Sequence, residues 1–319
     1  MNGFRECFRE YVHGVARGTI KYRGKRVGLR TVESYQTALK HYEEFCLRKE
    51  QLYLDEVDLY NFTSRKDRVA AKKKANQHWA DFLTFLQKRV GVASQEVYLA
   101  KIRCCLSHLE EEEMMQIPFN VQAPEVKHET LIWDNSMTEI LLAYKPRRRT
   151  EKCFQLQIHL CCRWSELKNL SFEKEIIDGE EVYQVNYLQD KTGTRVRPIV
   201  PKHIWEQSQG LKVSKYIASY NGSLRHWLSK FPEFNEYVTF SKQMKDGTLK
   251  TVRKKWCEMA TSHDLRRAGI NRLQVMGISD TVIREMYSGH KDAAVFNKHY
   301  VAMNKEKILS LNGRITKNS

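Results

Sequence analysis

The sequence predicts a mainly α-helical protein with a small antiparallel β-sheet, divided into two domains. Apolar residues recur every three or four positions through residues 31–109, which is the spacing of helices buried on one face. A proline-bearing stretch, 119–127, follows, and β-rich runs separated by glycine turns occupy 171–201. With 319 residues, the chain is long enough to bury a core in each of two domains.

The first domain is expected to span residues 31–118 and to consist of helices. In its first helix, apolar residues recur at three- and four-residue spacing from Val32 to Phe45. A second helix covers about 66–90 with an apolar stripe in its later half, and another helix follows Ser94. The extended segment 119–127 is then expected to act as the linker between the domains.

Residues 1–30 are expected to form a basic N-terminal arm. FRECFREYVHGV can form a short helix, and KYRGKRVGLR is basic and broken by glycines. Such an arm can follow a DNA backbone, but a flexible, solvated terminus is an equally good interpretation.

The charge balance favours a polyanionic partner. The chain carries 54 Lys and Arg against 38 Asp and Glu, a net charge of +16. Nucleic acid is a better candidate than a membrane surface, although a solvated basic surface is the simpler interpretation. The sequence has no signal-peptide pattern and no apolar run of bilayer length, so we expect a soluble, cytoplasmic protein associated with DNA and not with a membrane.

Cations cluster at the start of the second helix and on the outward side of the next one. Several cations at one helix end make a surface that can bind DNA phosphates, although an ordinary solvated face has the same composition. The candidate DNA-binding residues are Arg65, Lys66, Arg68, Lys72, Lys73, Lys74, Lys101 and Arg103.

The eight cysteines indicate neither a zinc site nor a disulfide framework. None forms a C-x-x-C pair, and two pairs, Cys104–Cys105 and Cys161–Cys162, are adjacent within helical runs. We interpret most of them as small buried apolar residues of an intracellular protein, and we expect no metal site.

The second domain is expected to span residues 128–319 and to open with two helices, 135–144 and 151–170. Near the end of the second helix, Arg163 is followed three residues later by Glu166 and then by a leucine. By itself, an Arg-x-x-Glu pair is a common feature of a helix surface.

The β-rich run after these helices predicts a three-stranded antiparallel sheet. An Asp178-Gly179 turn joins its first two strands, and a second turn, from Lys191 to Thr194, precedes the third. Lys191 is therefore expected at a hairpin tip, where a lysine is usually just solvated. Residues 201–260 are interpreted as helical and polar, and the basic stretch LKTVRKKW within them either approaches DNA or is simply exposed.

The last quarter of the chain begins with a helix that carries two polar candidates. Ser262 is a favourable N-cap residue, and the helical run ends near Gly277. His263 and Arg266 are three residues apart, so they share one face of the first turns.

A second helix is expected to start after Ser279 and to end before Gly289. His290 follows directly, and Tyr300 is the only tyrosine after it. This set of groups, two imidazoles, a guanidinium and a phenol, is suited to catalysis at a phosphodiester. The guanidinium binds the anion, and the phenol can become a covalent nucleophile.

In this order the motifs resemble those of the tyrosine recombinase (phage integrase) family. That family has, in sequence order, an arginine box, a lysine on a hairpin, H-x-x-R, G-H and a C-terminal tyrosine. In this chain the same order is given by Arg163, Lys191, His263, Arg266, His290 and Tyr300. The spacing from His290 to Tyr300 is one residue longer than the commonest family spacing, and Tyr287 is a second phenol nearby.

The resemblance implies an N-terminal helical core-binding (SAM-like) domain that clamps DNA, and a C-terminal α+β catalytic domain ending in a tail, 301–319, that docks on a neighbouring protomer or on its own domain. It also implies double-stranded DNA as the partner and four protomers on two DNA sites. No cofactor or metal is implied.

The resemblance also implies a role for each matched residue. Arg163 and Arg266 hold the non-bridging phosphate oxygens, and Tyr300 attacks phosphorus to give a 3′-phosphotyrosyl link. His263 is the candidate base, Lys191 the acid for the departing 5′ oxygen, and His290 a phosphate ligand. Glu166 is expected to support the fold around the arginines. The candidate catalytic residues are the six that match the family motifs, without Glu166: Arg163, Lys191, His263, Arg266, His290 and Tyr300.

The expected function is therefore site-specific DNA recombination, in a mobile element, a phage or an inversion system. A type IB topoisomerase-like enzyme shares the chemistry but relaxes DNA without pairing two sites. A catalytically inactive DNA-binding or architectural protein is an alternative from another class, and the longer spacing before Tyr300 is its best support.

Overall fold

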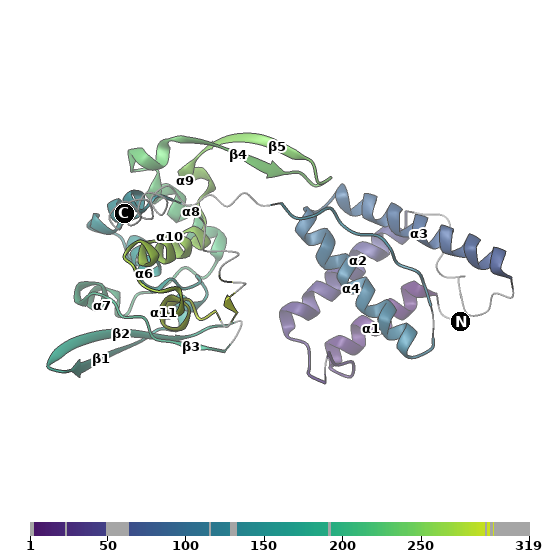
Figure 1. Ribbon diagram of the computed structural model, residues 1–319, viewed down its shortest axis with the longest axis horizontal. Coiled ribbons are helices and arrows are strands. Elements are labelled where there is room, and N and C mark those ends of the chain that lie inside the picture. The colour runs from purple at the N-terminus through teal and green to yellow at the C-terminus, as the bar shows by residue number, and fades with distance from the viewer. Residues whose placement is uncertain are drawn as a thin grey trace, which may run out of the picture. The chain divides into compact units, whose positions relative to one another are not determined.

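The computed structural model describes residues 3–22, 24–48, 64–114, 116–127, 133–190, 193–290, 292–293 and 296 (Figure 1). The fold is mainly helical, as the sequence predicts, and it has two small antiparallel sheets where the sequence predicts one. The chain divides into two compact units. Unit 1 comprises Met1–Glu129 and Ser241–Val252, and unit 2 comprises Thr130–Phe240 and Arg253–Ser319.

Unit 1 is built on helices that pack around an aromatic core. Trp79 and Phe82 are fully buried, and their rings lie 5.8 and 5.4 Å from the ring of Tyr42. Since these residues belong to the predicted apolar stripes, the predicted helices are confirmed. The helices are α1 (Phe4–Arg17), α2 (Leu29–Cys46), α3 (Arg65–Gln87) and α4 (Val92–Glu111).

The prediction of an N-terminal arm is wrong for the segment that forms α1. Phe4 and Phe8 are fully buried, and the ring of Phe4 lies 5.4 Å from those of both Tyr42 and Trp79. Apolar residues at helical spacing from Phe4 to Val15 give α1 a continuous buried face. This segment is therefore an integral helix of the unit 1 core.

The predicted linker lies along the surface of unit 1 without regular secondary structure. The indole Nε1 of Trp79 donates a hydrogen bond of 3.1 Å to the Pro118 carbonyl, and the Phe119 ring lies 4.9 Å from the Trp79 ring. Val121 and Ala123 also pack against this core. The first residues of the segment are thus held by the aromatic cluster.

Unit 2 has helices α6 and α10 packed against each other at its centre. Gly269 permits this close approach, because a Cβ there would lie 2.0 Å from the Ile158 carbonyl oxygen. The helical elements of unit 2 are α5 (Asn135–Ala143), α6 (Arg149–Leu160), η3 (Glu166–Lys168), α7 (Lys202–Ser208), α8 (Ile217–Leu228), η4 (Pro232–Asn235), α9 (Trp256–Met259), α10 (Ser262–Val275), α11 (Asp280–Val282) and η5 (Ile283–Ser288).

One predicted helix is shorter than expected. The sequence predicted a helix over 151–170, but α6 ends at Leu160 and Cys161 adopts a left-handed conformation with φ of 49°. Arg163 therefore lies in the turn after the helix and not on its surface.

The predicted three-stranded sheet is confirmed, with strand order β1-β2-β3. Asp178 and Gly179 both have positive φ, 50° and 85°, as a two-residue hairpin turn requires. The tip that contains Lys191 lies outside the described residues. The strands are β1 (Ser171–Ile177), β2 (Glu180–Leu188) and β3 (Arg195–Val196).

A second sheet was not predicted. Residues 201–260 were interpreted as helical, but they contain a two-stranded antiparallel ribbon of β4 (Tyr237–Gln243) and β5 (Leu249–Lys255). Its turn depends on Gly247, whose φ is 92°. β4 alternates apolar and polar residues only from Val238 to Ser241, and the apolar residues of β5, Leu249 and Val252, are three positions apart, so neither strand shows a clear period of two. In the described part of the chain, no helix is long and apolar enough to cross a membrane.

The contact at Gly269 gives a stability prediction. We expect Gly269→Ala to lower the free energy of unfolding by about 1–3 kcal/mol, because α6 and α10 must move apart to admit the methyl group. Gly222→Ala in α8 is the matched control, since a Cβ there meets nothing within 4 Å, and it should stabilise by about 0.5–1 kcal/mol. Urea denaturation measures both. A Gly269→Ala protein as stable as the parent would contradict the close helix contact.

Candidate active site

The candidate site is built on the first turns of α10. Thr261 caps this helix: its backbone N–H and its hydroxyl both donate to the Asp264 carboxylate, at 2.8 and 2.7 Å. The predicted N-cap, Ser262, is the first helical residue instead. The cap fixes the orientation of the helix that carries Arg266.

Arg266 is fully buried, which is unusual for a charged side chain. Its Nη1 donates to the Cys161 carbonyl at 2.5 Å, and its Nη2 donates to the Ser288 carbonyl at 2.9 Å. The guanidinium therefore joins the turn after α6 to the end of η5.

Glu166 balances the charge of two arginines. Its Oε1 accepts from Arg163 Nη1 at 2.8 Å, its Oε2 accepts from the Arg163 backbone N–H at 2.6 Å, and Oε2 lies 3.9 Å from Arg266 Nη1. The Glu166 side chain is fully buried, whereas that of Arg163 is 29% exposed. Two guanidinium groups and one carboxylate leave one net positive charge, and Arg163 places part of it within reach of a ligand.

A buried polar network fixes the turn that carries Arg163. Gln157 donates to the carbonyls of Cys162 and Ser262, both at 3.0 Å, and the Tyr220 hydroxyl donates to Gln157 Oε1 at 2.9 Å. Burial raises the pKa of Cys161 to about 12, although Arg266 acts in the opposite direction. The thiol therefore stays protonated. Cys161 contributes to the site through its backbone carbonyl, which accepts the hydrogen bond from Arg266.

His290 joins the same cluster. Its Nδ1 lies 2.9 Å from Ser288 Oγ and 3.4 Å from Arg266 Nη2. Arginine can only donate, so Nδ1 is assigned as the acceptor, which leaves the proton of a neutral ring on Nε2. His290 can therefore donate a hydrogen bond from Nε2 to an anion.

Gly289 makes this position of His290 possible. Its φ is 62°, and a Cβ there would lie 2.6 Å from the Gln189 side chain. Gln189 in turn donates from Nε2 to the Ser288 carbonyl. The end of η5 agrees with the predicted helix end before Gly289.

Tyr287 is poorly placed to act as a nucleophile. Its hydroxyl donates to the Ile199 carbonyl at 3.3 Å, and burial raises its pKa. Its own carbonyl accepts a hydrogen bond of 2.6 Å from the Tyr187 hydroxyl. These contacts assign Tyr287 a structural role.

The structure thus brings together Arg163, Arg266 and His290. His263 is exposed in the first turn of α10, one turn before Arg266. Lys191 and Tyr300 lie outside the described residues, as does the tail 301–319.

Sequence reasoning missed the residues that position this cluster. Five residues contact the cluster through backbone carbonyls or through one another, namely Ser288, Gln189, Gln157, Tyr187 and Tyr220. For Gln157 the available signal was a polar residue inside an apolar run, and such a signal does not identify the partner.

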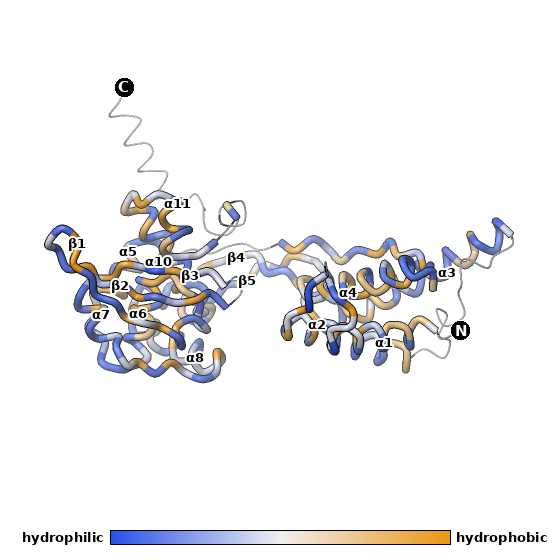
Figure 2. Tube along the Cα trace, turned by 90° about the horizontal axis from the view of Figure 1, so that it is seen from below, coloured by the Kyte–Doolittle hydropathy of each residue, from blue (hydrophilic) through white to orange (hydrophobic). Residues whose placement is uncertain are grey.

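The predicted DNA-binding residues on α3 are exposed in unit 1. Arg65, Lys66, Arg68 and Lys72–Lys74 all lie on its N-terminal half, which is hydrophilic in Figure 2. The two candidates on α4 are half-buried and already make contacts. Lys101 Nζ lies 4.5 Å above the Tyr35 ring, and Arg103 Nη1 pairs with Glu96 Oε1 at 3.0 Å.

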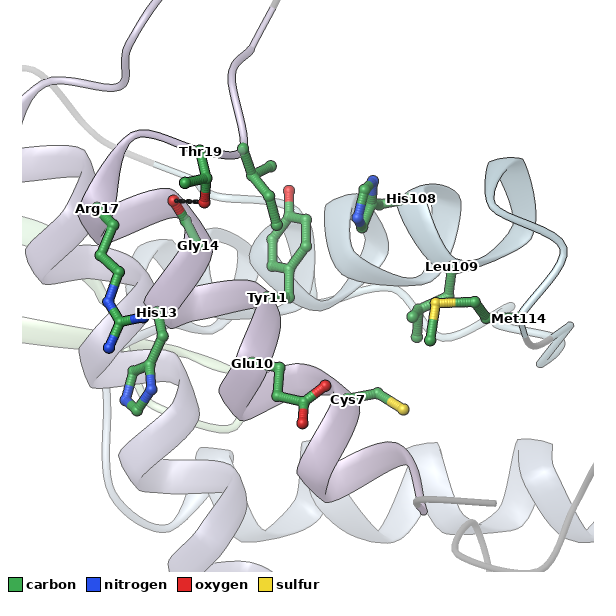
Figure 3. Close-up of a pocket in the computed structure, with 11 residues that line it drawn as sticks. Cys7, Glu10, Tyr11, His13, Gly14, Arg17, Thr19, His108, Leu109 and Met114 are labelled. Atoms are coloured by element: carbon green, nitrogen blue, oxygen red, sulfur yellow. Dashed lines mark hydrogen bonds between the residues drawn. The ribbon is translucent and has the colours of Figure 1, made fainter.

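Unit 1 also contains a cavity of about 370 Å³, between α1 and α4 (Figure 3). Tyr11 and His108 both line it, and their rings are in contact, with centres 5.2 Å apart. A second cavity, of about 420 Å³, is lined by Arg68, Lys72 and Phe119 among others. Both belong to unit 1, whereas the arginine cluster belongs to unit 2.

Comparison with solved structures finds this fold among DNA integrases. A structure of the Tn1549 transposon integrase in complex with circular intermediate DNA matches with a TM-score of 0.56 at 11% identity, covering 97% of this chain and 99% of that one. A lambda integrase dimer bound to a COC′ core site matches with a TM-score of 0.57 at 13% identity, covering 92% and 94%.

A lambda integrase tetramer bound to a Holliday junction matches with a TM-score of 0.55 at 13% identity, covering 92% of this chain and 79% of that one. No family model and no curated protein matches the sequence. The structural likeness extends over nearly the whole chain, and this chain therefore shares the fold of these integrases.

Proposed function

We propose that this chain is a site-specific DNA recombinase that cleaves and rejoins DNA strands through a 3′-phosphotyrosyl intermediate. The observation that carries the proposal is the fully buried Arg266, held beside the Glu166–Arg163 pair and His290. Such a fixed cluster of donors and positive charge is what a phosphodiester needs as negative charge builds on its oxygens.

The two arginines are assigned to the non-bridging phosphate oxygens. Arginine suits this role because its planar guanidinium donates paired hydrogen bonds and keeps its charge. Glu166 holds the Arg163 side chain and backbone together, so it acts as a positioning residue. His290 is assigned a further hydrogen bond to the phosphate from Nε2.

The remaining roles follow from the order of the motifs. The Tyr300 phenol attacks phosphorus and forms the P–O bond of the intermediate, while the bond to the 5′ oxygen breaks. His263 accepts the phenol proton, and Lys191 gives a proton to the departing 5′ oxygen. Attack by the 5′ hydroxyl of another strand reverses these steps, so the phosphodiester energy is conserved and no ATP is needed.

The proposed partner is double-stranded DNA, bound by four protomers on two sites. The cations on α3 offer a surface for its phosphates, and the matched lambda integrase structure is a tetramer bound to a Holliday junction. A topoisomerase-like enzyme or an inactive DNA-binding protein is less well supported, since the matched structures are integrases.

The nucleophile can be tested with two tyrosine variants. The parent protein, incubated with a nicked duplex carrying its recombination site and then denatured, should give a covalent protein–DNA band. We expect Tyr300→Phe to abolish this band. Tyr287→Phe, the matched control, should keep it, because the Tyr287 hydroxyl is bound to the Ile199 carbonyl.

Persistence of the band in Tyr300→Phe and its loss in Tyr287→Phe would move the nucleophile to Tyr287. No band from any of the three proteins on tightly bound cognate DNA would favour the inactive DNA-binding alternative.

The role of Glu166 gives a second prediction. Glu166→Gln should lower the free energy of unfolding by about 3 kcal/mol, because an amide cannot balance the buried Arg266 charge. Glu139→Gln is the control: Glu139 pairs with Arg272 at 2.7 Å, but its side chain is 48% exposed, so its loss should cost about 0–1 kcal/mol. Urea denaturation compares them, and equal losses would show that Glu166 does not compensate Arg266.

A further inference from the structure

Most residues of the β4–β5 ribbon are exposed, although Val238, Phe240 and Val252 are half-buried. Hairpins of two strands are only marginally stable alone. Its turn is anchored within unit 1. Gln95 Nε2 donates to the Lys245 carbonyl at 2.6 Å, and Gln243 donates to the Glu125 carbonyl at 2.7 Å while accepting from the Lys127 backbone N–H at 3.0 Å. These contacts hold the turn of the ribbon in place.

The ribbon is strongly basic. Between Tyr237 and Lys255 it has six cations and one carboxylate. That carboxylate, Asp246, accepts hydrogen bonds from the Thr248 backbone N–H and hydroxyl at 3.0 and 2.7 Å, so it serves the turn. The ribbon itself therefore supplies little negative charge to balance the positive charge of its cations.

The strand register places three lysines on one face. Hydrogen bonds from Met244 N–H to the Thr248 carbonyl and from Trp256 N–H to the Glu236 carbonyl fix that register. It sets Lys242 opposite Lys250, and Lys254 follows Lys250 on the same face, because side chains alternate along a strand. All three lysines are exposed, and within the described part of the chain none of them takes part in an ion pair.

Directly opposed like charges destabilise a hairpin. Nothing in the packing of the ribbon requires this arrangement, since the three side chains point into solvent. An external polyanion would remove the repulsion, and DNA phosphates are the polyanion that the proposed function supplies.

We propose that the face of the β4–β5 ribbon bearing Lys242, Lys250 and Lys254 binds the phosphate backbone of duplex DNA. This inference rests on the proposed function, because that function makes DNA the ligand. The contact is independent of base sequence, so it positions the protein on the duplex and does not select the site.

The test is the salt dependence of DNA binding, measured by fluorescence anisotropy on a labelled duplex. Each phosphate contact contributes about 0.9 to the slope of log K against log salt concentration. The full-length triple variant Lys242→Gln, Lys250→Gln, Lys254→Gln should therefore lose about 2 to 3 from the slope. Its Tm should not fall, because the variant also removes a repulsive pair.

The matched control neutralises three exposed lysines outside the ribbon: Lys145→Gln, Lys212→Gln, Lys215→Gln. It carries the same change in net charge and should leave the slope nearly unchanged. Equal slopes for the two triple variants would overturn the ribbon inference while leaving the proposed function intact. Absence of DNA binding by the parent protein would overturn both. Ribbon-dependent binding to an acidic peptide with an unchanged DNA slope would assign the face to a protein partner instead.

Discussion

The structure of the candidate site depends on one requirement: the buried charge of Arg266 must be compensated. A guanidinium removed from water is strongly destabilising unless its donors and its charge all find partners. The Cys161 and Ser288 carbonyls and the Glu166 carboxylate supply them. This requirement fixes three segments that are far apart in sequence, namely the turn after α6, the first turns of α10 and the end of η5. It also accounts for the left-handed backbone at Cys161, which turns a carbonyl toward the arginine.

The same requirement makes the site preorganised. Gln157, Tyr220 and Gln189 satisfy neighbouring backbone groups, so the cluster keeps its shape before any ligand binds. Preorganised donors stabilise developing charge more effectively than groups that must first reorient. The partly exposed Arg163 and the Nε2 atom of His290 are the parts of this cluster that can meet a phosphate. The deeper groups hold these two in position.

The cations of the chain occur in two settings that differ in solvation. On α3 and on the β4–β5 ribbon the cations are exposed and hydrated, which suits reversible, salt-dependent contacts with a polyanion. In the candidate site, Arg266 is desolvated, so its field acts at short range and with little screening. In the proposed function, the first arrangement would serve binding along a duplex, and the second would serve stabilisation of a transition state at one phosphate.

The sequence by itself predicted the main helices and the Asp178-Gly179 turn, because local periodicity and turn chemistry depend on short stretches of chain. The order of its motifs singled out Arg163, Arg266 and His290 as candidate site residues. Only the tertiary structure decided that α1 belongs to the core, that α6 ends at Leu160, and that β4 and β5 pair. Each of these outcomes depends on a partner distant in sequence: Trp79 for α1, Arg266 for the turn after α6, and the opposite strand of the ribbon for each of its lysines. When a distant partner stabilises the burial of a residue or the conformation of its backbone, the neighbouring sequence carries no pattern that reveals this.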